Sequence, residues 1–429
     1  MLKRYNWGKY NSWHPRKALY PSSLDELQLI VAKAKENHEK IRIAGSLHSM
    51  NAICETSEIQ VHTDKLDKIL QIDKARKTVR TEGGIKIYTL LEILAHEGLT
   101  LPNQGYITDQ SIAGAISTAT HGSGKTGTLS SFVEEIELVD GQGKIHHLTP
   151  ASNPHLFSAA VVSLGCLGII YALTLRCIPL EKLRLSKLRT NRASLAPKFS
   201  EVIKEEYFQF ALDPYSDEII QWQYSKTTEA IQNRWKYLLN WLLIKSFAIC
   251  TLDIMPTPYW LLPHLLKIYF AASPIKNCID YSYKLLSPAD EGHYIEEEIA
   301  VPQVYFGQAL AETRWIIDQF RKQKKCFVAI ILLRFADADP YGYLSPAKGR
   351  QTGYISLITI AKKGYKELFQ EFENSMYKFQ GKPHWGKEHS LTKEKASQLY
   401  GEDYIKFVEA KKELDPAGIF SNAYIDTLF

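Results

Sequence analysis

Two segments rich in glycine and serine constrain the fold of this chain more than any other feature of its sequence. The first covers residues 45–50, Gly-Ser-Leu-His-Ser-Met, and follows a short alternating apolar run at 41–44. The second covers residues 111–124 and consists mostly of glycine, alanine, serine and threonine. Because glycine lacks a side chain, such segments bring backbone N–H groups close to a bound anion such as a pyrophosphate. Tight turns inside a core are the alternative interpretation, since glycine most often marks turns.

The patterns around these segments indicate an α+β fold. Up to about residue 180, helical periodicity covers 23–37 and 87–96, and strand patterns cover 41–44, 59–62, 78–81 and 132–139. Between 181 and 380 glycine becomes sparse and most of the 24 tyrosines occur, which indicates a second domain. Its strand patterns cover 218–223, 327–335 and 354–360, and its helical patterns cover 304–323 and 365–376.

The length of 429 residues also requires more than one packed unit, because single domains contain roughly 100–200 residues. We therefore expect one domain over 1–180 and a second over 181–380. Short glycine and proline motifs return in the final segment, 381–429.

Charge and cysteine usage exclude several classes of protein. The formal net charge of +5 is small and evenly spread, so we expect no nucleic-acid partner. Six scattered cysteines form no Cys-x-x-Cys pair, so we expect neither a metal site nor a disulfide framework. The polar start of the chain lacks the apolar core of a secretion signal, about 7–15 residues long. These features together predict a cytoplasmic protein.

The most apolar region, residues 237–272, leaves two interpretations open. Charged and proline residues interrupt it, whereas a spanning helix needs about 20 largely unbroken apolar residues. It therefore forms either core of the second domain or an exposed patch that contacts a membrane surface.

Residues 119–126, Ala-Thr-His-Gly-Ser-Gly-Lys-Thr, fit a relaxed phosphate-loop pattern and suggest a nucleotide triphosphatase as an alternative. That loop works only between a buried strand and a helix whose amide groups face the phosphates. Here the following residues read as strand at 132–139, so this interpretation is disfavoured.

Five segments, at 42–49, 109–124, 163–170, 383–387 and 415–422, together resemble the vanillyl-alcohol-oxidase, or PCMH-type, FAD-linked oxidoreductases. Within that family the match is to the aldonolactone (gulonolactone or arabinonolactone) oxidase and alditol oxidase branch. The resemblance implies a two-subdomain PCMH-type FAD-binding domain over 1–180. It also implies a substrate, or cap, domain over 181–380, with an antiparallel sheet flanked by helices, and a segment, 381–429, that returns to the FAD domain.

The resemblance implies that FAD is the cofactor. The residues that match the family's cofactor-binding positions are Gly45, Ser46, Leu47, His48, Ser49, Met50, Gly105, Tyr106, Ser111, Gly114, Ala115, Ile116, Ser117, His121, Gly122, Gly168, Ile169, Lys387 and Asn422. His48 matches the histidine that bonds covalently to the flavin ring in this family. Without the resemblance, a histidine after such a turn reads as a hydrogen-bonded loop residue.

Three residues are candidates for catalysis, namely Arg334, Lys387 and Tyr106. The resemblance implies that Arg334 and Lys387 stabilise negative charge on the substrate oxygen or the reduced ring. Tyr106 stands where a small residue is usual, and the neighbouring Gly105 is compatible with oxygen access. The family motif has a glutamate where this chain has Leu332, and alditol oxidases have a histidine near Ser356, so the predicted pocket is less polar.

These matches predict an FAD-dependent enzyme that takes hydride from a CH–OH group of a lactone, sugar, polyol or related alcohol. Dioxygen then reoxidises the flavin and yields hydrogen peroxide. A dehydrogenase of the same fold that passes electrons to a quinone or a protein is the alternative, and a non-catalytic flavoprotein is a third. The substrate, the proton acceptor and the oligomeric state are left open.

Overall fold

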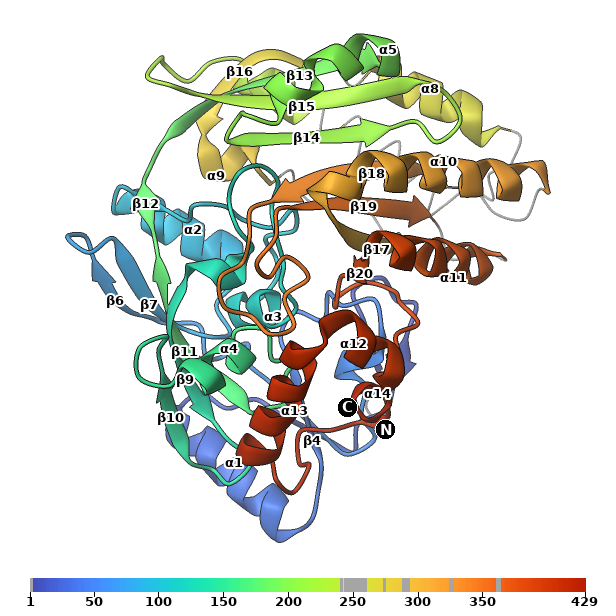
Figure 1. The fold of residues 1–429 in the computed structure, drawn as a ribbon. Helices are drawn as coiled ribbons and strands as arrows, with labels where there is room; N and C mark the ends of the chain where they lie inside the picture. Colours follow the sequence, from blue (N-terminus) through green and yellow to red (C-terminus); the bar gives the residue numbers. More distant parts are fainter. Residues whose placement is uncertain are drawn as a thin grey trace.

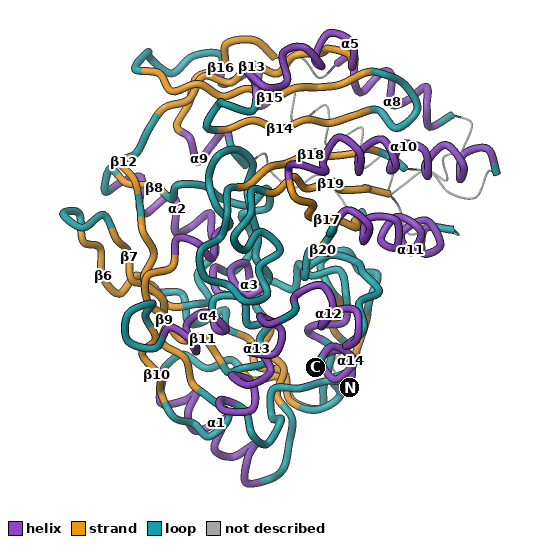
Figure 2. The backbone as a smooth tube through the Cα atoms, viewed as in Figure 1, coloured by secondary structure: helices purple, strands orange, loops and turns teal. Residues whose placement is uncertain are grey.

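A computed structural model describes residues 3–239, 242, 261–272, 275–287, 294–323, 328–359 and 364–429. The chain forms an amino-terminal α+β part below a large antiparallel sheet (Figure 1). Loops gather between these two parts (Figure 2).

The amino-terminal part contains two main sheets. A parallel sheet has the order β3 (Lys17–Leu19), β5 (Ile59–His62), β4 (Ile41–Ala44). An antiparallel sheet has the order β10 (Ile145–Leu148), β9 (Val133–Val139), β11 (Ile169–Arg176), β7 (Thr78–Glu82), β6 (Ile69–Asp73). Helix α1 (Leu24–Glu36) buries Leu27, Val31 and Ala34, and the Ser23 hydroxyl accepts a hydrogen bond from Glu26 N at 3.3 Å.

The large sheet has eight antiparallel strands. Their order is β16 (Ile275–Tyr281), β13 (Lys182–Asn191), β15 (Glu218–Thr227), β14 (Tyr207–Leu212), β18 (Ile330–Ala336), β19 (Thr352–Thr359), β17 (Ile295–Pro302), β20 (Lys382–Pro383). Helices α10 (Phe306–Lys322) and α11 (Tyr365–Met376) pack on one face and bury apolar side chains against β17 and β18. On the opposite face, Phe270 of α8 (Leu262–Ala272) packs against β13, β14 and β15. Leu332 and Arg334 of β18 line a cavity together with Tyr106 and His121 of the amino-terminal part.

After β20 the chain returns to the amino-terminal part through α12 (Lys393–Tyr400), α13 (Glu402–Leu414) and α14 (Ala423–Leu428). Phe407, Leu414 and Ile425 join the same core as Leu90 of α2 (Ile87–His96). Figure 1 shows these helices against the amino-terminal sheets, well below α11.

Several local predictions are confirmed. Helices α2 and α11 and strand β5 occupy the predicted residues, and β9 occupies most of the predicted 132–139. The second small-residue segment differs from a simple turn, because it includes the short helix α3 (Ile112–Ser117).

The phosphate-loop alternative fails on structural grounds. Helix α3 lies before the loop, and a 3-10 turn and then β9 follow it. The loop amides are already bonded to the large sheet and its connections: Gly124 N donates to Phe335 O at 3.0 Å and Lys125 N to Glu206 O at 2.9 Å. They are therefore not available to a phosphate.

Candidate active site

The two small-residue segments meet and line one cavity, which we call the glycine-lined cavity. A Cβ atom at Gly45 would lie 2.1 Å from the Ser111 hydroxyl, and one at Gly114 would lie 2.9 Å from the same oxygen. Its walls include Gly45, Ser49, Ser111, Gly114, Ser117, Ser163, Gly165 and Gly168. This arrangement exposes backbone and hydroxyl groups at close range, as a pyrophosphate and its sugar require.

A lysine that was not among the predicted residues approaches the first segment. Lys86 Nζ lies 2.5 Å from the Ser46 hydroxyl and 3.9 Å from Asp64. Lys86 therefore places a cation beside the turn where a dianionic group would bind.

His48 projects from the first segment into a neighbouring cavity. Its side chain is 4% exposed, and its Nε2 lies 3.5 Å from Asp109 Oδ2. A hydrogen bond from His48 lowers the pKa of Asp109. The His48 Nδ1 atom is buried and has no hydrogen-bond partner among the described residues. Leu47 adopts a left-handed backbone (φ 58°), and its carbonyl accepts a hydrogen bond from Trp7 N at 2.8 Å, which fixes the turn.

The neighbouring cavity, which we call the charged cavity, lies between this turn and the large sheet. Its walls include His48, Ser49, Met50, Tyr106, His121, Glu296, Glu298, Leu332, Arg334, His384 and Lys387. The structure thus brings together the three predicted catalytic residues and several predicted cofactor residues.

Two cations and two carboxylates form an ion-pair network in the charged cavity. Arg334 donates to Glu298 Oε1 at 2.9 Å and lies 3.4 Å from Glu296 Oε1. Lys387 Nζ lies 2.5 Å from Glu296 Oε2. Glu296 and Glu298 on β17 and Arg334 on β18 are all buried. Solvent therefore screens their charges only weakly.

Strand register explains how the carboxylates arrive there. Leu332 of β18 pairs with Ser356 of β19, and Ser356 pairs with Glu298 of β17. The Ser356 hydroxyl donates to Glu298 Oε1 at 2.7 Å. Glu298 therefore supplies, from two strands away, a carboxylate that position 332 lacks.

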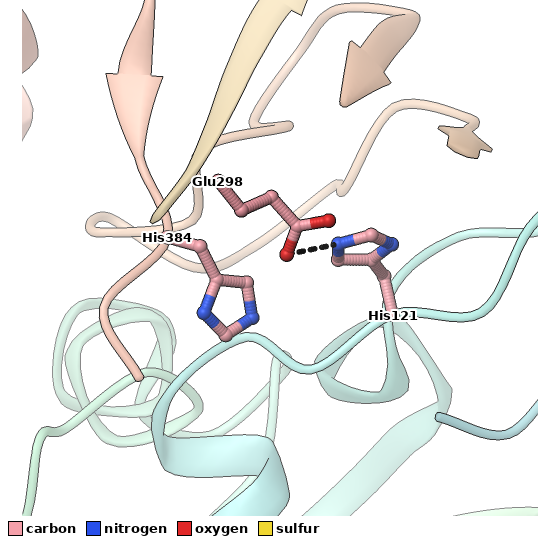
Figure 3. A group of neighbouring side chains, drawn as sticks. All are labelled: His121, Glu298 and His384. Carbon is pink, nitrogen blue, oxygen red and sulfur yellow. Dashed lines mark ion pairs between the residues drawn. The ribbon is translucent and has the colours of Figure 1, made fainter. Parts of the chain in front are cut away.

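Two histidines complete the cluster, and Figure 3 shows both rings beside the Glu298 carboxylate. His121 Nε2 lies 3.4 Å from Glu298 Oε2, and the His121 ring stacks on Tyr354 with centroids 3.5 Å apart. Burial lowers the pKa of His384 to about 3, so this ring is neutral. Burial alone would raise the pKa of Glu298, but the Arg334 guanidinium beside it holds that pKa well below its ordinary value.

Other predicted residues lie outside the two cavities. The Asn422 side chain caps α14, and its amide donates to Glu55 O at 2.8 Å and Ala52 O at 3.1 Å, so it ties the carboxyl-terminal segment to the turn at 52–55. Ala115, Ile116 and Ile169 are core residues.

The two remaining glycines are explained by close packing. A Cβ at Gly105 would lie 2.5 Å from the Thr120 methyl group, and one at Gly122 would lie 1.9 Å from Asn103 Oδ1. These contacts require glycine at both positions.

Sequence reasoning missed Glu296, Glu298, His384 and Lys86. The signal for the first two was the run of three glutamates, 296–298, inside an otherwise apolar strand pattern. A buried strand that carries acidic residues needs cationic partners, and two cations were already candidates.

Comparison with known proteins identifies the family. Residues 15–149 match the family model described as an FAD binding domain, and residues 173–428 match the model described as D-arabinono-1,4-lactone oxidase. The chain belongs to the D-arabinono-1,4-lactone oxidase family. It is 29% identical to L-gulonolactone oxidase of Mus musculus, over 99% of this chain and 97% of that protein.

Further relatives have related names. L-gulono-1,4-lactone dehydrogenase of Mycobacterium tuberculosis is 29% identical over 98% of this chain and 97% of the relative. D-arabinono-1,4-lactone oxidase of Candida glabrata is 32% identical over 59% of this chain and 51% of the relative. The crystal structure of cholesterol oxidase from B. sterolicum has a TM-score of 0.85 and 14% identity, and covers 99% of this chain and 96% of that one. At this identity the last likeness shows the fold alone.

This member of the D-arabinono-1,4-lactone oxidase family is therefore an FAD-dependent oxidoreductase, as the sequence motifs predicted. The glycine-lined cavity fits that cofactor, because side chains at Gly45 or Gly114 would close it. The buried His48 Nδ1 atom, which has no hydrogen-bond partner among the described residues, also fits a bound group beside the turn.

Proposed function

We propose that the enzyme oxidises a CH–OH group of a sugar-derived 1,4-lactone. The observation that carries this proposal is the network of Arg334, Lys387, Glu296 and Glu298 at the end of the cofactor site. Several fixed hydrogen-bonding groups suit a polyhydroxylated ring, and the names of the relatives favour a lactone. Ser356 and Glu298 offset the loss of polarity at Leu332.

The residues of the charged cavity would orient the substrate and stabilise charge. Bound FAD supplies a ring that accepts hydride. Arg334, which is 7% exposed, and Lys387 would bind the reacting oxygen and stabilise the negative charge that develops on it. Glu296 holds both cations in place through its two carboxylate oxygens.

Anaerobic addition of L-gulono-1,4-lactone or D-arabinono-1,4-lactone to the purified flavoprotein tests the substrate class. We expect the flavin absorbance to bleach with a lactone and to change far more slowly with an acyclic polyol. Bleaching by polyols alone would contradict the lactone proposal.

We propose that dioxygen reoxidises the flavin, as in the relatives named oxidases. The relative named a dehydrogenase makes a different acceptor the second candidate. Stoichiometric hydrogen peroxide during lactone turnover in air would support the oxidase. Turnover that needs an added quinone or dye, with no peroxide, would favour the dehydrogenase.

We propose that His48 bonds covalently to the flavin through its Nδ1 atom. This nitrogen is buried and lacks a hydrogen-bond partner among the described residues, while Nε2 faces Asp109. We expect acid denaturation to leave a yellow pellet for the natural protein and a colourless pellet for His48→Ala, with the flavin in the supernatant. Release of flavin from the natural protein under the same treatment would refute the bond.

We propose that the protein is cytoplasmic and can contact a membrane surface near 237–272. The described cysteines, Cys54, Cys166, Cys177 and Cys278, are free thiols, which suits a reducing compartment. No helix among the described residues is long and apolar enough to cross a bilayer. Much of 237–272, including 243–260, lies outside the described residues.

Apolar side chains just before residues 243–260 support the proposed membrane contact. Trp235, Leu238, Leu239 and Leu242 recur at helical spacing, and their exposed fractions are 64%, 54%, 48% and 46%. We expect the natural protein to float with anionic liposomes and a Trp235→Glu/Leu239→Glu variant to remain in the soluble fraction. Equal behaviour of the two proteins would remove the membrane proposal.

A further inference from the structure

We propose that His121 is the base that accepts the hydroxyl proton of the substrate. This inference rests on the proposed oxidation of a CH–OH group, and it assigns the proton acceptor that the sequence left open. It follows from hydrogen bonds that fix which nitrogen of each histidine in the charged cavity carries a proton.

The hydrogen bond at His121 Nδ1 defines the tautomer of this ring. Nδ1 lies 2.8 Å from the carbonyl oxygen of Gly122. A carbonyl oxygen only accepts hydrogen bonds, so Nδ1 carries the proton and neutral His121 has its lone pair on Nε2. This Nε2 atom is buried and has no hydrogen-bond partner among the described residues, and the side chain lines the charged cavity. An oriented lone pair on a side chain that lines the substrate cavity is what a general base requires.

The surroundings of His121 stabilise the protonated ring. Once Nε2 gains a proton, the imidazolium faces Glu298 Oε2 at 3.4 Å. Glu298 remains ionised because Arg334 donates to its other oxygen. The face of Tyr354 lies parallel to the ring within 17° and holds its plane. The product of proton transfer is thus an ion pair inside the site.

The other titratable groups of the cavity are less suited to this role. His384 Nδ1 accepts a hydrogen bond from Gly386 N at 3.0 Å, so neutral His384 carries its proton on Nε2 and acts as a donor. Glu296 is paired with both Lys387 and Arg334. The two histidines therefore have opposite tautomers, and the nitrogen of His121 that can accept a proton, Nε2, lies beside the Glu298 carboxylate.

A metal ion is the competing interpretation of the same side chains. Ligand atoms of His121, Glu298 and His384 lie within 4.8 Å of one another, and two histidines with one carboxylate form a known metal-binding set. The hydrogen bond to His384 Nδ1 leaves the proton of this ring on Nε2, and the Arg334 guanidinium lies 2.9 Å from Glu298. Both features favour a proton over a divalent cation at this position.

Oxidation of the CH–OH group releases one proton and one hydride. The O–H bond of the substrate breaks, its electron pair forms the second bond of the carbonyl, and the proton moves to His121 Nε2. The C–H bond breaks, and its hydrogen leaves with both electrons as hydride to FAD. The proton on His121 is then released to solvent or to the reduced oxygen species, so the ring returns to its neutral form.

The test uses the full-length flavoprotein with His121→Asn, whose amide can still donate to Gly122 O. We expect the rate of anaerobic flavin reduction by the lactone to fall about 10²–10⁴-fold. The residual rate should rise with pH as hydroxide replaces the base, while FAD content stays unchanged. Glu298, Tyr354 and His384 lie against this ring, and Arg334 and Lys387 line the same cavity, so each pH profile is compared with that of the natural protein. His155→Asn, on α4 (Pro154–Ala160) and bonded to Tyr343, is the matched control, and we expect it to behave like the natural protein.

A measurement without substrate separates this inference from the proposed function. In protein labelled with ¹⁵N-histidine, we expect His121 to carry its proton on Nδ1 and His384 on Nε2, with the signals assigned from His121→Asn and His384→Asn variants. A proton on His121 Nε2, or a His121→Asn variant with the natural reduction rate, would overturn the inference. Loss of activity on treatment with a chelator, restored by a divalent metal, would also overturn it. If no lactone bleaches the flavin of the natural protein, the proposed substrate class is wrong. The ¹⁵N measurement then still decides whether His121 Nε2 carries a lone pair.

Discussion

Replacement of Arg334 by methionine is expected to lower kcat/KM for a lactone by about 10³-fold, with FAD still bound. Removal of one preorganised donor to a developing oxyanion costs about 10²–10³ in rate. The change also removes the Arg334 cation from beside Glu298 and one of the two cations from beside Glu296. Because Glu298 is buried, its pKa then rises toward that of a buried acid without a partner. Steady-state kinetics and anaerobic flavin reduction measure the effect.

Two variants control for this result. Arg334→Lys keeps the charge but not the planar donor group, so we expect it to recover part of the loss. Arg189→Met removes an exposed arginine that pairs with Glu218 on β15, and it should leave the kinetics unchanged. If Arg334→Met kept kcat/KM within about threefold, a direct role for this residue in charge stabilisation would be excluded.

Replacement of Arg42 by methionine is expected to lower the free energy of unfolding by about 4 kcal/mol or more. The Arg42 side chain on β4 is 1% exposed and donates to four backbone carbonyls, those of Ile53, Leu164, Gly165 and Phe420, at 2.7–3.0 Å. Hydrogen bonds to a charged group contribute about 1.5–3 kcal/mol each, without simple additivity. The loss leaves several buried acceptors without a donor.

The same change should weaken FAD binding, because Leu164 and Gly165 line the glycine-lined cavity. Urea unfolding midpoints of the flavin-free and flavin-bound protein, with the flavin content, measure both effects. Arg16→Met, at an exposed arginine that pairs with Glu39, is the control and should change stability by less than about 1 kcal/mol. A midpoint for Arg42→Met equal to that of the control would contradict this role.

Local features of the sequence were predictable because their causes are local. The apolar spacing of 87–96 and 365–376 requires a helix in any fold that buries one face, and both helices are present. Glycine at 45 and 114 is needed where another chain segment touches the backbone, so these positions could be recognised as a candidate cofactor site.

The family and the cofactor were recognisable from the sequence, since motifs such as 42–49 and 383–387 carry them within a few residues, and Arg334 and Lys387 were predicted as cations of the site. Which carboxylates meet those cations depends on long-range packing. The alternation of β17 puts Glu296 and Glu298 on one face, but pairing with β19, more than fifty residues later in the chain, brings Glu298 to Ser356 and Arg334. The role inferred for His121 likewise depends on a hydrogen bond to Gly122 and on Glu298, from a distant strand. Strand register between distant segments comes from packing of the whole sheet, which no local pattern encodes.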